Sequence, residues 1–206
     1  VLPLSKHFDR GDRVEVTRDG VRYSVDRSDY MQWCIWADLV DWNWKHCLAR
    51  HVDGTAVLDV GANVGAFALK VCRELHDRGS SSRVVAVEPN PTIAVQLRRN
   101  VDLNRSFTSS LDLWEFAVGD HDGETEFHVD PINTGGGRIA SDVRRGAESM
   151  RVPLRTLDAV TAEKAIGKVG ILKVDVEGFE PEVLAGATRI LGDDRPVLYL
   201  EVSDDW

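Results

Sequence analysis

The segment 57–65, VLDVGANVG, combines an acidic side chain with glycines directly after an apolar run. Gly61 and Gly65 have no Cβ, so the backbone there can turn sharply and approach a ligand closely. The Asp59 carboxylate beside this turn would repel a pyrophosphate, whereas it suits a cationic ligand that carries an ammonium and a sulfonium group. We therefore predict a site for a cationic, nucleotide-like ligand. The alternative is that these glycines are needed only for the backbone turn and that no ligand binds there.

A second acidic side chain, Glu88, follows the next apolar run, 83–87. At the end of a neighbouring strand, its carboxylate can accept hydrogen bonds from both hydroxyls of an adenosine ribose. Two acids at neighbouring strand ends favour S-adenosylmethionine over NAD as the ligand. The usual G-x-G-x-x-G spacing of dinucleotide sites is also missing from the sequence, so an NAD-dependent oxidoreductase is the less favoured alternative.

A third group of charged residues lies in 171–182, ILKVDVEGFEPE. Its apolar part predicts a buried strand, and Pro181 between two glutamates predicts the first turn of a helix. Asp175 then lies at the carboxyl end of a parallel strand, where ligands of open α/β sheets bind. With Glu177 it could hold a divalent ion, or repulsion between the two carboxylates could raise the pKa of one and make it a general base. Glu177 as a capping acid for the following helix is the alternative.

These sites require a framework in which strands and helices alternate. Strand-like and helix-like apolar spacing alternate along the chain, which predicts a mostly parallel α/β sheet with right-handed crossovers. The expected strands are 56–60, 83–87, 111–118, 171–176 and 196–202, and the expected helices are 64–76, 92–104 and one that begins near Pro181. Two short strands, 124–129 and 151–155, interrupt this alternation, and Pro153 predicts an edge position for the second. The glycine-rich segment between them is a substrate flap or merely an exposed loop.

An N-terminal extension, 1–54, precedes this domain, which we place at 55–206. Alternating residues on either side of Asp19-Gly20 predict a β-hairpin that covers one edge of the domain. From Ser28, a candidate N-cap, apolar side chains at three- and four-residue steps predict one or two amphipathic helices. Tryptophans in this region are expected to pack the extension onto the domain, or alternatively to form a lid over the site: Trp33, Trp36, Trp42 and Trp44.

Composition narrows the possible partners and location. A net charge of −9 argues against a surface that tracks nucleic-acid phosphates. No apolar run approaches the roughly 20 residues of a membrane span, and the N-terminus lacks a signal-peptide core. The cysteines, Cys34, Cys47 and Cys72, lack metal-binding spacing and are expected to be buried free thiols. We therefore expect a cytoplasmic protein without nucleic-acid or membrane partners.

Together these motifs resemble those of the FkbM-type S-adenosylmethionine-dependent methyltransferases. The resemblance rests on 58–65, LDVGANVG, on Glu88-Pro89-Asn90, on Leu157-Asp158 and on the motifs within 172–187. It covers about residues 56–202 and leaves out the hairpin and the tryptophan-rich region. It implies a class I, Rossmann-like methyltransferase fold with helices on both faces of the sheet. It also implies methylation of a hydroxyl on a small molecule, natural product or sugar.

The resemblance implies a set of cofactor-binding residues as well. The glycine loop would hold the amino-acid end of the cofactor, the Glu88 region the ribose, and the next strand end the adenine. The residues concerned are Asp59, Gly61, Asn63, Gly65, Glu88, Asn90, Ala117, Val118 and Asp175.

Methyl transfer to an alcohol requires removal of its proton. Asp175 is the candidate base, with Glu177 or Lys173 assisting. We predict no metal; if a divalent ion is used, its expected ligands are Asp175, Glu177 and Glu201.

The end of the chain adds a final expectation. A complete fold of this class continues beyond the strand 196–202 with a helix and an antiparallel strand pair, which this sequence lacks. Either the sequence is a fragment, or an exposed sheet edge favours association into a homo-oligomer. A catalytically inactive binding or assembly module with the same fold is the alternative function.

Overall fold

The computed structural model describes residues 13–40, 44–130, 133, 136–139 and 148–201. The expectations that concern Trp42, Gly135 of the glycine-rich segment between 129 and 151, and the chain end at 202–206 lie outside these residues.

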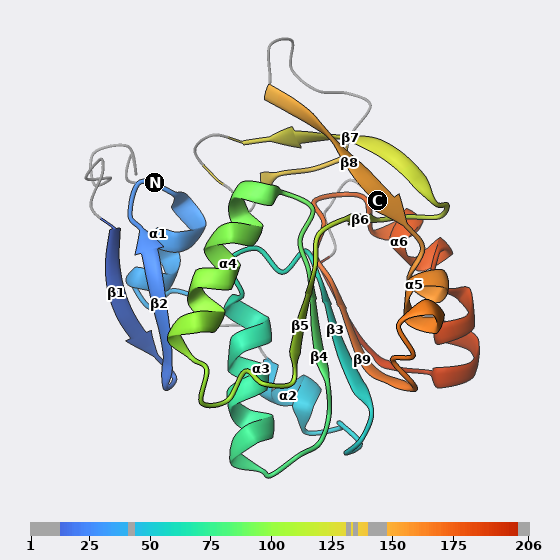
Figure 1. Cartoon of the computed structure of the whole chain (residues 1–206), viewed down its shortest axis with the longest axis horizontal. Coiled ribbons are helices and arrows are strands. Elements are labelled where there is room, and N and C mark those ends of the chain that lie inside the picture. Colours follow the sequence, from blue (N-terminus) through green and yellow to red (C-terminus); the bar gives the residue numbers. More distant parts are fainter. Residues whose placement is uncertain (1–12, 41–43, 131–132, 134–135, 140–147, 202–206) are drawn as a thin grey trace.

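A five-stranded parallel sheet with the strand order β10-β9-β3-β4-β5 forms the centre of the fold (Figure 1). Its strands are β3 (Ala56–Val60), β4 (Val84–Val87), β5 (Leu111–Trp114), β9 (Val169–Val174) and β10 (Val197–Leu200). The chain adds β4 and β5 on one side of β3, and β9 and β10 on the other. The direction of winding therefore reverses between β3 and β9, and open α/β sheets bind ligands beyond the carboxyl ends of the strands at such a reversal.

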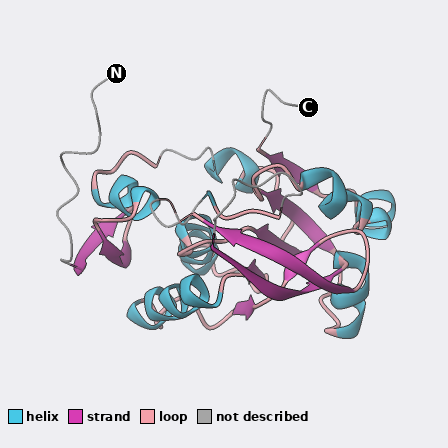
Figure 2. Ribbon diagram, turned by 90° about the horizontal axis from the view of Figure 1, so that it is seen from above, coloured by secondary structure: helices cyan, strands magenta, loops and turns pink. Residues whose placement is uncertain are grey.

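Helices cover both faces of this sheet (Figures 1 and 2). The side chains of β3 point alternately to the two faces of the sheet. Val57 packs on one face, in the core beneath α3 and α4, whereas Leu58 and Val60 pack on the other face, in the core beneath α5 and α6. This confirms the predicted α/β class. The helical elements are α3 (Ala66–Asp77), α4 (Pro91–Leu103), α5 (Leu157–Glu163), α6 (Glu180–Ala185) and a π-helical turn, η3 (Ile190–Asp194).

A second sheet, of three strands, lies beyond the carboxyl ends of the parallel strands (Figure 1). Its order is β6-β8-β7, with β6 (Ala117–Val118), β7 (Gly123–Val129) and β8 (Glu148–Arg155). The expected single strand 111–118 is thus two strands, because β5 ends at Trp114 and β6 leaves the parallel sheet to pair with β8.

The predicted edge position of the strand that contains Pro153 is wrong. Strand β8 is the middle strand, antiparallel to β7 and parallel to β6. Strand β6 pairs only with Leu154 and Arg155, so Pro153 lies just outside that pairing. A residue without a backbone N–H is tolerated there, although the strand is central.

The predicted N-terminal hairpin is confirmed, with β1 (Arg13–Arg18) and β2 (Val21–Asp26) joined at Asp19-Gly20. Strand β2 packs on α4 and is followed by α1 (Tyr30–Trp36) and α2 (Trp44–Leu48). The N-cap of α1 is Asp29 rather than Ser28, because the Asp29 carboxylate accepts a hydrogen bond from the backbone N–H of Gln32.

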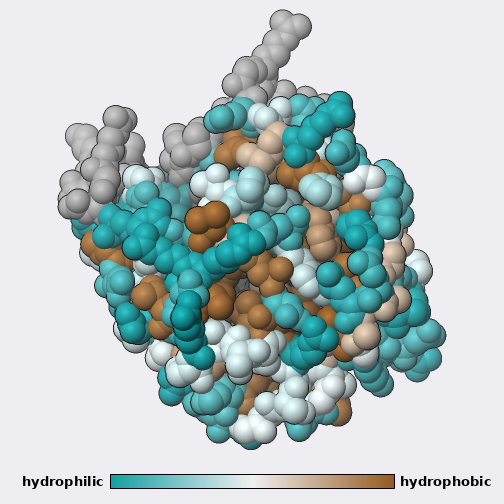
Figure 3. Space-filling model, in the orientation of Figure 1, coloured by the Kyte–Doolittle hydropathy of each residue, from teal (hydrophilic) through white to brown (hydrophobic). Residues whose placement is uncertain are grey.

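Figure 3 shows a face on which hydrophilic residues predominate and hydrophobic residues are interspersed. Exposed apolar side chains such as Leu39 and Val95 are usual at protein surfaces. None of the helices in the described ranges is both long and apolar enough to cross a membrane.

Candidate active site

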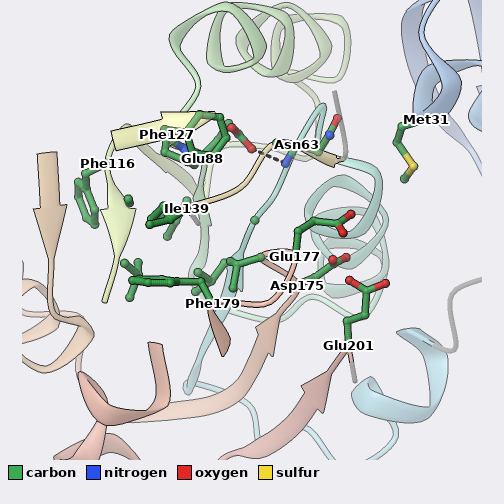
Figure 4. A pocket seen from close by; sticks show the side chains of 18 of the residues that line it. Met31, Asn63, Glu88, Phe116, Phe127, Ile139, Asp175, Glu177, Phe179 and Glu201 are labelled. Carbon is green, nitrogen blue, oxygen red and sulfur yellow. Dashed lines mark hydrogen bonds between the residues drawn. The ribbon is translucent and has the colours of Figure 1, made fainter. Parts of the chain in front are cut away.

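A cavity of about 510 Å³ lies between the carboxyl ends of the parallel strands and the second sheet. Figure 4 shows apolar side chains on one side of it and carboxylates on the other, with Glu88 and Asn63 along the wall between them. The apolar side chains are Phe116, Phe127, Ile139 and Phe179, and the carboxylates are Asp175, Glu177 and Glu201. The cavity therefore has two chemically different ends.

Glu88 is held in the cavity wall by two backbone groups. Its Oε2 accepts a hydrogen bond from the N–H of Asn63 and its Oε1 accepts one from the N–H of Asn90, each at 2.9 Å. Burial nevertheless raises the pKa of the Glu88 carboxyl to about 7. An ionised carboxylate has further lone pairs beyond these two bonds, so Glu88 can also accept hydrogen bonds from a ligand.

Asp59 and Lys173 form a buried ion pair behind the cavity. Both side chains are 0% exposed, and Lys173 Nζ lies 3.0 Å from Asp59 Oδ1. The other carboxylate oxygen of Asp59 accepts a hydrogen bond from the N–H of Ala68 in the first turn of α3, whose N-cap residue, Gly65, offers no side chain. Asp59 thus faces the helix layer and is not among the residues that line the cavity. In this arrangement the negative charge of Asp59 stabilises the N-terminus of α3 and the ammonium group of Lys173.

Lys173 connects that buried pair to the cavity. Its ammonium group also lies 3.3 Å from Asp175 Oδ2 and donates a hydrogen bond to the carbonyl oxygen of Gly61 at 3.3 Å. Burial lowers the pKa of Lys173, but the charges of Asp59 and Asp175 outweigh this effect and raise it above its usual value. Because the ammonium group is fully buried, Lys173 acts on the cavity through Asp175 and Gly61.

The three carboxylates come from the ends of two neighbouring strands. Asp175 directly follows β9, and Glu201 directly follows β10. One carboxylate oxygen from each of Asp175, Glu177 and Glu201 lies within 4.8 Å of the others. The structure therefore brings these three residues together, although β9 ends at Val174 and does not extend to Glu177.

Their ionisation differs because their surroundings differ. Burial raises the pKa of Asp175, but the Lys173 ammonium and a hydrogen bond with Glu201 outweigh it and keep this pKa below its usual value. The hydrogen bond with Asp175, together with burial, raises the pKa of Glu201 to about 8. Burial and the charge of Asp175 also raise the pKa of Glu177.

The loop between β9 and α6 is shaped by Glu180 rather than by Glu177. The buried Glu180 carboxylate accepts hydrogen bonds from the N–H groups of Val176 and Gly178. Glu177 has a left-handed backbone conformation, with φ of +57°, and lines the cavity. The alternative of Glu177 as a capping acid is therefore wrong, and its carboxylate belongs to the acidic end of the cavity.

The two glycines of the first loop both have a left-handed backbone conformation, with φ of +79° at Gly61 and +90° at Gly65. A Cβ on Gly61 would lie 1.8 Å from the carbonyl oxygen of Asp175, and one on Gly65 would lie 2.4 Å from Leu97 Cδ1. Gly61 also lines the cavity, whereas Gly65 does not. Asn90 likewise lies outside the lining, where its side chain caps α4.

Six residues of the expected cofactor set line the cavity: Gly61, Asn63, Glu88, Ala117, Val118 and Asp175. The sequence reasoning missed the apolar end, although alternation in β7 and the position of Phe179 directly after the acidic loop were available signals. It also missed Tyr30 and Met31 of α1, which line the cavity. Trp33 and Trp36, on the same helix, do not line it, so these two tryptophans do not form the lid that was the alternative to packing.

The sequence model of the family described as "Methyltransferase FkbM domain" matches residues 59–206. The chain belongs to this family. This result confirms the resemblance inferred from the motifs and favours a methyltransferase over an oxidoreductase.

Three relatives illustrate the similarity. The 2-O-methyltransferase NoeI of Sinorhizobium fredii is 27% identical over 165 residues, which cover 72% of this chain and 63% of NoeI. The hexuronic acid methyltransferase AglP of Haloferax volcanii is 31% identical over 133 residues, which cover 65% of this chain and 50% of AglP. The 31-O-demethyl-FK506 methyltransferase FkbM of Streptomyces tacrolimicus is 31% identical over 172 residues, which cover 68% of this chain and 64% of that enzyme. The chain thus spans between half and about two thirds of the length of these relatives.

Proposed function

We propose that the protein transfers a methyl group from S-adenosylmethionine to a hydroxyl group of a small molecule, a natural product or a sugar. The observation that carries this proposal is the two-ended cavity at the reversal of the sheet, with an apolar end, Glu88 in its wall and a cluster of carboxylates. The names of NoeI, AglP and the FK506 methyltransferase support methylation, and two of these names specify an oxygen acceptor.

The lining residues fit the parts of this cofactor. The apolar end, with Phe116 and Phe127, suits an adenine ring, and Glu88 can accept hydrogen bonds from the ribose hydroxyls. The Gly61 and Asn63 segment of the loop is the candidate contact for the amino-acid part. When bound, S-adenosylmethionine supplies a methyl group on a positively charged sulfur. The carboxylates of the acidic end favour such a positive charge in the cavity.

Asp59 takes an indirect role in this proposal. Because its carboxylate is fully buried against Lys173 and α3, we assign it to positioning of the loop instead of direct contact with the cofactor. Lys173 is likewise a positioning residue, since its ammonium group holds Asp175 and the Gly61 carbonyl in place.

The acidic end can take the proton of the acceptor. An alcohol is a poor nucleophile until its proton is at least partly removed, and a carboxylate within hydrogen-bonding distance can do this. We assign this role to Asp175, with Glu177 as a second hydrogen-bond acceptor for the substrate. Should a divalent ion take part, the same two residues and Glu201 would provide oxygen ligands. The protein would otherwise contribute mainly proximity and alignment.

The charge of the lining favours a neutral or cationic acceptor. Four carboxylates line the cavity, and none of the described lining residues is Lys, Arg or His. An anionic acceptor would meet like charge at the acidic end. We therefore do not transfer to this chain the hexuronic acid that the name of AglP specifies.

The proposal is tested by measuring binding and transfer separately. Calorimetry with S-adenosylhomocysteine is expected to show binding, and a labelled methyl group from S-adenosylmethionine is expected to reach a hydroxyl in a panel of glycosides and polyketides. Asp175→Asn should abolish transfer while S-adenosylhomocysteine still binds. Glu124→Gln, which alters an exposed acid on β7, is the matched control and should leave both unchanged.

Other outcomes identify the alternatives. Folded protein that binds no S-adenosylhomocysteine would refute the proposal, and binding of NADH in a fluorescence titration would favour an oxidoreductase. Binding of S-adenosylhomocysteine without transfer to any member of the panel would favour an inactive binding module.

A further inference from the structure

We propose that helix α1 forms the wall of the cavity that selects the acceptor, through Tyr30 and Met31. This inference rests on the proposed function, because it assumes that the cofactor occupies the apolar end. The family match begins at Asp59, so the two residues lie in a segment that the match does not cover. The rest of the described cavity lining comes from residues 60–201.

The position of α1 places it on the acceptor side. Figure 4 shows Met31 on the same side of the cavity as Glu177 and Glu201, away from Phe116 and Ile139. If adenine occupies the apolar end, the transferable methyl group points toward the acids, and the acceptor must enter beside them. Met31 and the 39% exposed Tyr30 are then the lining residues of the N-terminal segment that an acceptor meets.

The first turn of α1 is firmly fixed, as a selective wall requires. Asp29 caps the helix, and the buried Gln32 side chain accepts a hydrogen bond from the N–H of Asp26 at the end of β2. Ile35, one turn further on, is buried in the main core. Tyr30 and Met31 are therefore held between two anchored points.

Strand β2, which directly precedes α1, is in turn hydrogen-bonded to α4. Asn100 accepts a hydrogen bond from the N–H of Ser24 at 2.8 Å, and Asn104 accepts one from the N–H of Arg22 at 2.9 Å. The side chains of Gln96 and Asn104 donate to the carbonyl oxygens of the same two β2 residues. Helix α4 begins directly after Asn90, whose N–H binds Glu88. Helix α4 is thus hydrogen-bonded to β2, and its N-cap residue is hydrogen-bonded to Glu88, so α4 sets the position of α1 relative to the carboxylate assigned to the ribose.

The chemistry of this wall defines the kind of acceptor. A tyrosine ring and a flexible thioether offer apolar contact surface, and the nearby carboxylates accept hydrogen bonds from hydroxyl groups. The acceptor that fits is a hydroxylated molecule with at least one apolar face, held by Tyr30 and Met31 on that face and by the acids at its hydroxyls.

A thiol probe tests the placement without knowledge of the acceptor. In a Met31→Cys variant, the rate of modification by a thiol reagent is measured with and without saturating S-adenosylhomocysteine, and the wild-type chain supplies the background of its own cysteines. The rate is expected to change by less than about twofold, because position 31 stays open when the cofactor end is filled. Trp36→Cys, on the same helix but outside the lining, is the matched control. Protection of Met31→Cys by about tenfold or more, with no protection of Trp36→Cys, would overturn the placement.

Substitution tests the selection itself. Tyr30→Ala and Met31→Ala should leave the dissociation constant of S-adenosylhomocysteine within about twofold, but should lower kcat/KM for the best acceptor by about tenfold or more, or reverse the ranking of two acceptors. Trp36→Ala should do neither. Unchanged kcat/KM and ranking in both variants would overturn the inference, as would a loss of S-adenosylhomocysteine affinity. A wild-type chain that does not bind S-adenosylhomocysteine would instead refute the proposed function.

Discussion

Replacement of Lys173 by methionine is expected to destabilise the fold by about 3–5 kcal/mol, the usual cost of leaving one member of a buried ion pair alone. Lys173 and Asp59 are both 0% exposed, with Nζ 3.0 Å from Oδ1. In the variant, the Asp59 carboxylate would retain its hydrogen bond from the N–H of Ala68 at 3.2 Å but would lose its counter-charge. Burial already raises the pKa of the Asp59 carboxyl, and Lys173 opposes that rise.

The loss is measured as a shift in thermal midpoint. For a domain of this size, about 1 kcal/mol corresponds to roughly 2–4 °C, so the variant should melt about 6–20 °C below the wild type near neutral pH. Removal of Lys173 raises the folded-state pKa of Asp59 further. The destabilisation is then complete above this folded-state pKa, declines as the pH falls below it, and is gone below the unfolded-state pKa. The difference between variant and wild type should therefore shrink as the pH falls toward about 4.

A double variant provides the control. Asp59→Leu combined with Lys173→Met replaces the pair by apolar side chains of similar length, and buried pairs replaced in this way often keep or gain stability. The double variant should recover most of the loss seen in Lys173→Met, although it also removes the acceptor for Ala68. A Lys173→Met variant that melts within about 2 °C of the wild type, or strictly additive effects in the double variant, would refute the assignment of Asp59 to a structural pair.

Three further predictions concern the cavity. Binding of S-adenosylhomocysteine, followed by calorimetry, should weaken by up to about tenfold per unit as the pH falls below about 7, because protonation removes acceptor capacity from Glu88. Glu88→Gln should flatten this profile, and a flat wild-type profile would contradict the assignment. Gly61→Ala should abolish transfer and lower the melting temperature, since the added Cβ would lie 1.8 Å from the carbonyl oxygen of Asp175. Gly79→Ala is the control for backbone strain alone, because Gly79 has a similar positive φ and open space around it. Equal losses of stability in the two variants would argue against a steric clash at Gly61. Treatment with EDTA should change the transfer rate by less than about twofold, because the Lys173 ammonium already lies beside Asp175. A loss that Mg²⁺ restores would instead place a metal on the acidic cluster.

Much of the fold follows from local patterns. Continuous apolar runs predict strands buried on both faces, and the acids that end these runs must then gather at one edge of a parallel sheet. This reasoning places Glu88, Asp175 and Glu201 around one cavity, as observed. It depends on the strands being parallel and neighbouring, and not on the details of side-chain contacts.

The role of Asp59 could not be predicted in the same way, because it depends on register. Strand β3 pairs with β9 so that Asp59 and Lys173 are direct partners, and alternation turns both side chains toward α3. A shift of one residue in that pairing would have turned the lysine to the other face of the sheet. Neither segment taken alone specifies this pairing. The sequence therefore indicates no partner for the Asp59 carboxylate within the fold, and we predicted that it contacts the ligand.

The contribution of α1 to the cavity depends on contacts that no local pattern contains. Gln96 and Asn100 of α4 and its C-cap residue, Asn104, recur every four residues, and a polar stripe of this kind normally predicts a face exposed to water. Here the stripe is buried, because the main chain of β2 occupies it and takes the place of solvent. That docking fixes the direction in which α1 leaves the hairpin, so its first turn meets the cavity while its larger tryptophans do not. Selection of the acceptor therefore depends on how a polar helix face is paired, and residue size within α1 is a poor guide to which side chains line the cavity.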